Sequence, residues 1–220
     1  MGSSISVIEG HGHPKPLEPG RRYRVRIQLN DCAQSFPAGH RIRLAISTAY
    51  WPIAWPSPEP VTLTLFAGAS TLELPERPPS PADAAFAQVP PVETPPPLEV
   101  ATLLPGSTKV TVRRDLETGE SVYEFSHDGG KLRFEQNGLV MASRTTGSYS
   151  IHPDEPLSAQ AAFDWRIEFE RGDWRVATRA RGQMSATRED FHVKAELEAF
   201  EGDRRVFGND WTLRVPRDGV

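Results

Sequence analysis

The sequence predicts an all-β fold, with a β-sandwich near the N-terminus and a second antiparallel β-rich segment after it. Apolar and polar residues alternate along several short runs, and Gly, Asp and Pro residues typical of turns separate those runs. No window keeps apolar residues at the spacing of an amphipathic helix. The 220 residues are enough for one large β domain or two smaller ones with a hydrophobic core.

Composition and pattern divide the chain into four predicted segments. We expect a flexible N-terminus over 1–14, the core of the sandwich over 15–75, a proline-rich linker or crossover over 76–97, and an antiparallel meander over 98–220. Prolines disfavour pairing inside a sheet and favour an extended polyproline conformation, which is why we expect a linker. The meander is either a separate domain or an extension of the sandwich.

The first half of the chain carries four runs with the period of a half-buried strand. The clearest run begins at Tyr23, where Val25 and Ile27 point one way while Arg24 and Arg26 point the other. Short strands at this spacing are typical of a sandwich. The predicted strands are Tyr23–Leu29, Arg41–Ile46, Val61–Leu65 and Thr71–Leu74.

The second half predicts hairpins. Glu-Thr-Gly and Asp-Gly-Gly are expected turns, and Arg171-Gly172-Asp173, although it matches an adhesion tripeptide, lies where two alternating strands need a tight turn. We expect ion pairs across the sheet from Arg175, Arg179 and Arg181 to Glu168, Glu196 and Glu198. Closure into a ligand-holding barrel is an alternative for this segment. The predicted strands are Val110–Val112, Ser121–Phe125, Lys131–Phe134, Ala161–Phe169, Trp174–Ala180, Phe191–Ala199 and Trp211–Val215.

Charge and cysteine content exclude several classes of protein. Lys and Arg number 25 against 29 Asp and Glu, so the chain lacks the basic surplus of a nucleic-acid binder. No apolar stretch approaches the length needed to cross a bilayer, and no signal peptide is evident. The single cysteine, Cys32, excludes an internal disulfide framework and fits a reducing compartment. We expect a cytoplasmic protein with neither nucleic-acid nor membrane partners.

The sequence predicts no catalytic, cofactor or metal site. The nucleophile elbow Gly-x-Ser-x-Gly is absent, since Gly68-Ala69-Ser70 and Gly147-Ser148 lack the second glycine. His11 and His13 could hold a metal only weakly, because a closed site needs three or four ligands. The remaining histidines outside Gly39-His40-Arg41 are scattered, and we expect them to be solvated.

The most promising surface feature is the aromatic and proline cluster around Tyr50, Trp51 and Trp55. A rigid loop with two tryptophans can form a hydrophobic contact patch. It could fold back as a cap over the sandwich, or it could contact another domain or line a ligand groove. We favour an interdomain contact that also includes His40, for which a structural hydrogen bond is the simplest role.

Two stretches carry a family resemblance: HPKPLEPGRRYRVRIQLND from His13, and FPAGHRIRLAISTAYWPIAWPS from Phe36 to Ser57. They resemble the start of the C-terminal, jelly-roll or galactose-binding-like domain of the X-Pro dipeptidyl-peptidase and cocaine esterase (CocE/NonD) family. The resemblance implies a catalytic α/β-hydrolase domain with a Ser, Asp, His triad, N-terminal to the matching part. It covers about the first ninety residues of this sequence, and no catalytic residue can be carried over.

The resemblance leads to one main hypothesis and one alternative. The chain is expected to be a non-catalytic accessory region that stabilises and encloses the active site of a serine hydrolase, whose α/β-hydrolase domain is its partner in cis or has been lost. An exposed tryptophan loop and an orphaned interdomain face could also drive homo-oligomerisation. The alternative is a free-standing β-sandwich that binds carbohydrate or another small ligand.

Overall fold

The computed structural model describes residues 17–86 and 91–218, and its regular structure is almost entirely β. Strands hold 49% of the residues and helices 3%, so the all-β prediction is confirmed. The two helical turns are η1 (Ala67–Ala69) and α1 (Asp83–Phe86). The strands are β1 (Val100–Leu104), β2 (Ser107–Arg114), β3 (Ser121–Phe134), β4 (Leu139–His152), β5 (Glu155–Arg171), β6 (Trp174–Ala186), β7 (Asp190–Glu201) and β8 (Arg204–Pro216).

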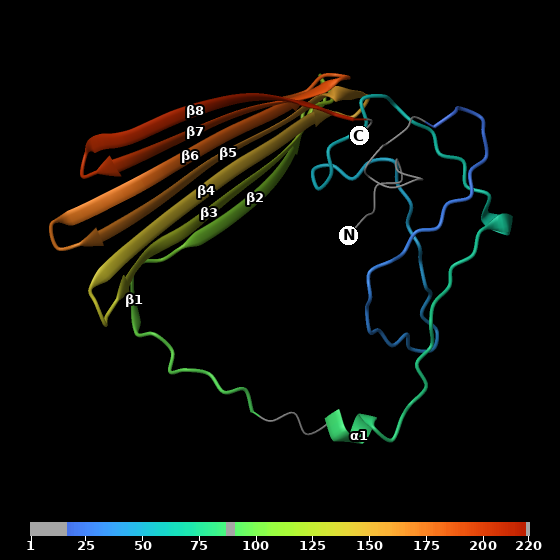
Figure 1. Ribbon diagram of the computed structural model, residues 1–220, viewed down its shortest axis with the longest axis horizontal. Coiled ribbons are helices and arrows are strands. Elements are labelled where there is room, and N and C mark those ends of the chain that lie inside the picture. The colour runs from blue at the N-terminus through green and yellow to red at the C-terminus, as the bar shows by residue number, and fades with distance from the viewer. Residues whose placement is uncertain (1–16, 87–90, 219–220) are drawn as a thin grey trace.

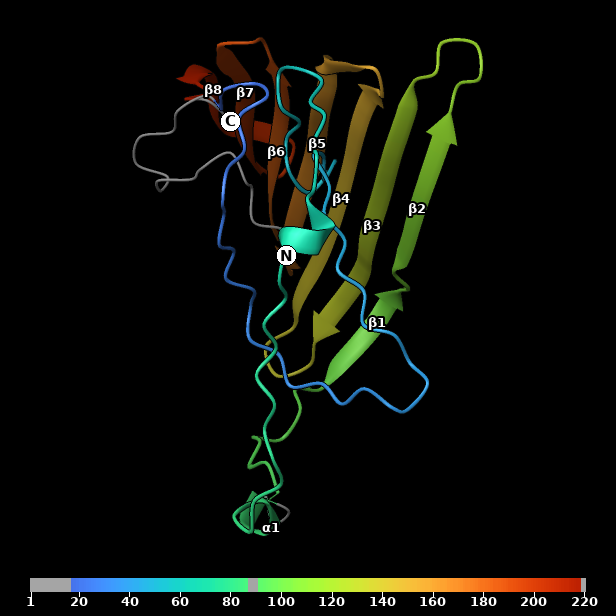
Figure 2. The ribbon, with the colours of Figure 1, turned by 90° about the vertical axis from the view of Figure 1, so that its right-hand side faces the viewer.

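The eight strands form one open antiparallel sheet, in which β3 to β8 follow one another in chain order (Figure 1). From β3 to β8 each strand pairs with the next along the chain, as expected where short turns bring neighbours together. The strands β1 and β2 lie end to end along the free edge of β3 (Figure 2). Among the described residues β8 pairs only with β7, so the sheet does not close into the barrel considered as an alternative.

Tight hairpins hold the register of the last four strands. Only Gly172 and Asp173 separate β5 from β6, and only Gly202 and Asp203 separate β7 from β8. Gly172 has φ 58° and Gly202 has φ 59°, values that glycine adopts without steric cost. The prediction of a turn at Arg171-Gly172-Asp173 is therefore confirmed.

The prediction of a turn at Asp128-Gly129-Gly130 was wrong. These residues lie inside β3, where the pairing with β4 shifts register between Asp128 and Lys131. The Gly130 N–H donates to Asp128 Oδ1 at 2.9 Å, and Gly130 has φ 72°. A β-bulge uses the same residue types as a turn, so composition alone could not separate the two. The long, Ser- and Thr-rich β4 was also missed.

The residues before β1 contain no strand between 17 and 82 in the structure, although the sequence predicts four there. Their alternating apolar residues are exposed, for example Ile27 at 41%, Leu44 at 52% and Leu63 at 49%. Alternation tells which side of an extended chain is apolar, but a strand also needs a hydrogen-bonded neighbour. Among residues 17–86 and 91–218 no strand pairs with these runs, so these strand predictions fail in this structure. The flexible segment expected over 1–14 lies outside the described residues.

The molecule leaves an unusually large surface open. Its accessible area is 18105 Å², whereas a compact monomer of 24.4 kDa exposes on the order of 10,000 Å². Ala159 and Ala177 are the only buried hydrophobic residues in the part that the structure describes, and no large side chain there is fully buried. Most of the apolar surface therefore has no covering layer.

Candidate functional site

The tryptophan loop, residues 50–59, is the part of the N-terminal segment that packs most closely on the sheet. Trp51 and Trp55 meet edge to face, with ring centroids 5.1 Å apart and planes at 86°. The Ala54 N–H donates to the Tyr50 carbonyl at 2.8 Å and closes the turn between the two indoles. The loop thus presents two large rings as one unit.

Each indole contacts an aromatic ring of the sheet. Trp51 lies against Tyr149 of β4 with centroids 5.9 Å apart, and Trp55 lies against Phe191 of β7 with centroids 6.0 Å apart. Both pairs are T-shaped, the geometry that places a ring's positive edge on its neighbour's negative face. The loop therefore bridges β4 and β7 at one end of the sheet.

A buried arginine fastens the loop from the other side. Arg217, directly after β8, is only 2% exposed, and its Nη2 donates to the Pro56 carbonyl at 2.6 Å. Nη1 donates to the Thr187 carbonyl at 3.2 Å, and the guanidinium lies 4.7 Å from the centre of the Phe191 ring. Burial lowers the pKa of Arg217. We call Trp51, Trp55, Pro56, Tyr149, Phe191 and Arg217 the clasp.

Two weaker features border the clasp. Arg188 forms an exposed ion pair with Glu59 at the end of the tryptophan loop. The indole Nε1 of Trp55 is buried without an acceptor in the part of the chain that the structure describes. A buried donor left without a partner costs about 1–3 kcal/mol, so the ring contacts have to compensate for it.

The predicted contact residues separate into two groups. Trp51 and Trp55 come together on the sheet, whereas Tyr50 is 53% exposed and His40 is exposed in a turn, where its N–H donates to the Pro37 carbonyl at 3.1 Å. Sequence reasoning missed their partners Tyr149, Phe191 and Arg217. Only Phe191, at the start of a predicted strand, carried any signal.

An open apolar hollow lies between the tryptophan loop and the sheet. Its volume is about 420 Å³, and it is lined by Pro52 and Ile53 of the loop and by Tyr123, Phe125 and Tyr149 of the sheet. None of these side chains is charged, and the hydroxyls of Tyr123 and Tyr149 are the only polar side-chain groups among these five residues, so the hollow is mainly apolar. It is suited to contact with apolar groups.

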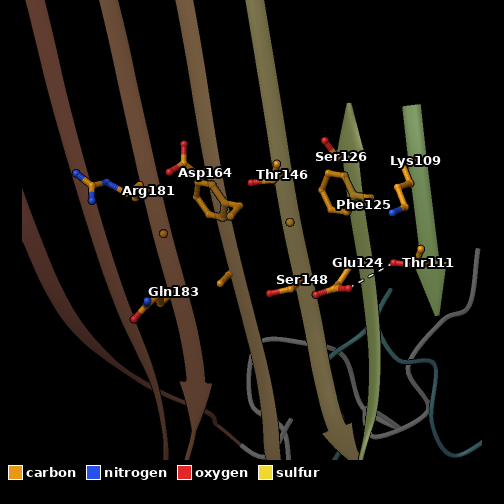
Figure 3. A pocket seen from close by; sticks show the side chains of 14 residues that line it. Lys109, Thr111, Glu124, Phe125, Ser126, Thr146, Ser148, Asp164, Arg181 and Gln183 are labelled. Carbon is orange, nitrogen blue, oxygen red and sulfur yellow. Dashed lines mark hydrogen bonds between the residues drawn. The ribbon is translucent and has the colours of Figure 1, made fainter. Parts of the chain in front are cut away.

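A second hollow of about 510 Å³ opens on the polar face of the sheet (Figure 3). Its carboxylates and its arginine are already paired: Glu124 with Arg113 at 3.3 Å, Asp164 with Arg179, and Arg181 with Glu198 at 2.8 Å. The hydrogen bond from Arg113 lowers the pKa of Glu124. The lining residues shown are Lys109, Thr111, Glu124, Phe125, Ser126, Thr146, Ser148, Asp164, Arg181 and Gln183.

The polar hollow is not arranged for catalysis. A carboxyl held ionised by an arginine is a poor proton donor near neutral pH, and no histidine lines the hollow beside Ser126 or Ser148. Within the described ranges no three His, Cys, Asp or Glu residues are placed to hold a metal ion. The hollow is therefore best described as an ion-paired β surface.

Only part of the predicted ion pairing is found. Arg181 pairs with Glu196 at 3.0 Å and with Glu198 at 2.8 Å, as expected. The predictions for the other two arginines were wrong, because Arg179 pairs with Asp164, and Arg175 pairs with Asp203 at 2.6 Å. The register places Arg166 opposite Arg179 and Asp164 opposite Arg181, so Asp164 is a diagonal neighbour of Arg179, and this register is not readable from the residue types alone.

Comparison with known proteins adds one finding. The family described as the X-Pro dipeptidyl-peptidase C-terminal non-catalytic domain matches residues 3–82. The matched range contains the tryptophan loop and ends before β1. No curated protein and no solved structure matches the chain significantly.

The match supports the peptidase part of the family resemblance and an accessory role beside a peptidase-like catalytic domain. The match covers less than half of the chain and includes no residue of the sheet. The described residues also include no helix long and apolar enough to cross a membrane.

Proposed function

We propose that the chain is the non-catalytic accessory region of a cytoplasmic serine hydrolase of the X-Pro dipeptidyl-peptidase and cocaine-esterase type. An α/β-hydrolase domain outside these residues cleaves the ester or amide bond. The accessory region, with a galactose-binding-like jelly roll completed by that partner, stabilises the hydrolase and helps to enclose its active site. The match of residues 3–82 to a non-catalytic domain carries this proposal.

The exposed apolar side chains between residues 17 and 82 support the proposal. Ile27, Leu44 and Leu63 sit on alternating runs that lack strand neighbours, and each is at least 41% exposed. A run of this kind is stable as a strand when a second surface covers its apolar side and supplies hydrogen-bond partners for its backbone. A hydrolase domain packed on this segment meets both needs.

The carbohydrate-binding alternative gains no support. Sugar recognition on tryptophan uses an open ring face, whereas Trp51 and Trp55 are engaged with each other and with the sheet. The two tryptophans expected to bind a sugar therefore do not support this alternative, and the accessory function is the one that we propose.

The first test asks whether the purified chain is a hydrolase. We expect no turnover of p-nitrophenyl esters or X-Pro anilides and no labelling by a fluorophosphonate probe, which reacts with activated serines. A catalytically active X-Pro dipeptidyl-peptidase serves as positive control. Turnover that is abolished by the probe contradicts the proposal.

The second test asks whether the uncovered segment binds a hydrolase domain. The chain is co-expressed with the α/β-hydrolase domain of an X-Pro dipeptidyl-peptidase, and co-purification is measured. Ile27→Glu places a charge on the apolar side and is expected to abolish co-purification. The matched control, Gln28→Glu, adds the same charge on the opposite side of the run and should leave it intact. Equal effects of both changes would remove the support for this surface.

A further inference from the structure

The sheet has an apolar face that the tryptophan loop covers only at one end. Residues paired in register share a face, so the row through Phe163 contains Phe125, Gly147, Gly182, Ala195 and Trp211. The row through Trp165 contains His127, Thr145, Ala180, Leu197 and Asn209. Neither row includes Lys, Arg, Asp or Glu. We call this surface, from β2 to β8 beyond the clasp, the open face.

Large side chains on the open face are strongly exposed. Phe163 and Trp165, near the centre of the sheet, are 51% and 48% exposed, and Trp211 on β8 is 39% exposed. Contiguous apolar patches of this extent are rare on monomeric proteins and mark interaction surfaces. The opposite face instead carries ion pairs such as Arg179 with Asp164 and Arg181 with Glu196. One face of the sheet is thus suited to water and the other to a covering partner.

The open face calls for a partner other than the proposed hydrolase domain. The family match ends at residue 82, and β1 begins at Val100, so the resemblance assigns a catalytic partner only to the segment before the sheet. The exposed apolar residues of that segment, such as Ile27 and Leu63, lie outside the sheet. The open face can therefore be covered by a partner that is not the hydrolase domain.

We infer that a second copy of this chain covers the open face, sheet against sheet. Because the central rows lack charged residues, two copies can meet without like-charge repulsion or unpaired buried ions. The sheet from β2 to β8 spans about 30 Å across the strands, and ten residues along them span about 33 Å. That footprint, about 1,000 Å², exceeds the roughly 800 Å² that each partner buries in a stable complex.

The shape of the open face, with projecting rings beside small residues, also suits the packing of two sheets. The Phe163 ring lies over Gly182, where an added Cβ would meet ring atom Cε1 at 2.3 Å. Ala180 and Ala195 are small residues beside Trp165 and Trp211, and they leave shallow depressions next to projecting rings. Rings of one copy can fill the depressions of the other at the spacing of packed sheets, which is about 10 Å.

Light scattering on the purified full-length chain tests this inference without any hydrolase. We expect twice the chain mass of 24.4 kDa at micromolar concentration. Trp165→Glu, at the centre of the open face, should raise the dimer dissociation constant by at least about 30-fold. Gln160→Glu, on the same strand but the opposite face, is the matched control and should leave the dimer intact.

A monomer at tens of micromolar, an open-ended aggregate, or a dimer that tolerates Trp165→Glu overturns the inference. Circular dichroism shows whether the variant keeps its β signal, and if it does not, Trp211→Glu on β8 takes its place with the same expectation. Because hydrolase binding is measured separately through Ile27→Glu, either proposal can fail while the other stands.

Discussion

The N-terminal segment of residues 17–82 and the sheet of residues 100–216 have similar alternating sequences, but only the second region forms strands. The sheet strands follow one another through short turns, so each finds its hydrogen-bonded neighbour locally. The runs in the N-terminal segment have no such neighbour and stay without strand pairing. Alternation therefore sets which side of a run is apolar, whereas the connections between runs decide whether each run can pair.

The largest expected effect comes from crowding the bulge of β3. Gly130→Ala would place a Cβ 2.3 Å from the Leu104 carbonyl oxygen and 2.7 Å from the Gly106 nitrogen, and both are backbone atoms. Together with the positive φ of 72°, this crowding should lower the free energy of unfolding of the sheet, measured with urea, by about 3 kcal/mol or more.

The matching change in the other region is Gly39→Ala. Gly39 also has a positive φ, 85°, but nothing lies within 4 Å of the added Cβ. The strain is local, about 1 kcal/mol, and the urea midpoint of the sheet should not move. An equal loss in both variants would contradict the separation of the two regions.

The next largest effect concerns the clasp. Arg217→Ala removes the donors to the Pro56 and Thr187 carbonyls and the contact with Phe191, at an expected cost of about 2–3 kcal/mol. Limited proteolysis should then cut within residues 50–59 much faster than in the unaltered chain. If the cutting rate stays the same, the clasp does not hold the loop on the sheet.

Acid should weaken the sheet in a defined direction. The pKa of Glu198 is lowered from 4.5 by its hydrogen bond with Arg181, and that of Asp190 is lowered from 3.8 by Arg214. A lowered pKa means that the folded state binds protons less readily than the unfolded state, so this stability is present above those ordinary values and is lost as the pH falls below them. Urea midpoints measured from pH 7 down to pH 3 should therefore decline most below about pH 4.5.

The smallest effect is expected at the exposed ion pair between Glu59 and Arg188. Glu59→Ala should change stability and proteolysis of the tryptophan loop by no more than about 0.5 kcal/mol, because solvent screens exposed pairs. A loss as large as that of Arg217→Ala would mean that charge, rather than the buried arginine, fastens the loop.

Local chemistry made part of this fold predictable. Gly172 between two alternating runs specified a hairpin, and the strands around Phe163, Trp174 and Trp211 followed from their period. The bulge at Gly130 could not be distinguished from a turn, since both use Asp and Gly. At the clasp, Trp51 and Trp55 stood out by type, but Arg217 binds the Pro56 carbonyl from 161 residues away, a separation that no local pattern reveals.

Hydrogen exchange of the backbone amides tests whether the runs of the N-terminal segment depend on a partner for pairing, because it reports pairing residue by residue. In the chain alone, we predict protection factors above about 1,000 across β4 to β7 and below about 10 over residues 23–29, 41–46 and 61–65. Adding the hydrolase domain should protect those three runs and leave the sheet unchanged. Strong protection of the three runs in the chain alone would contradict the claim that they depend on a partner.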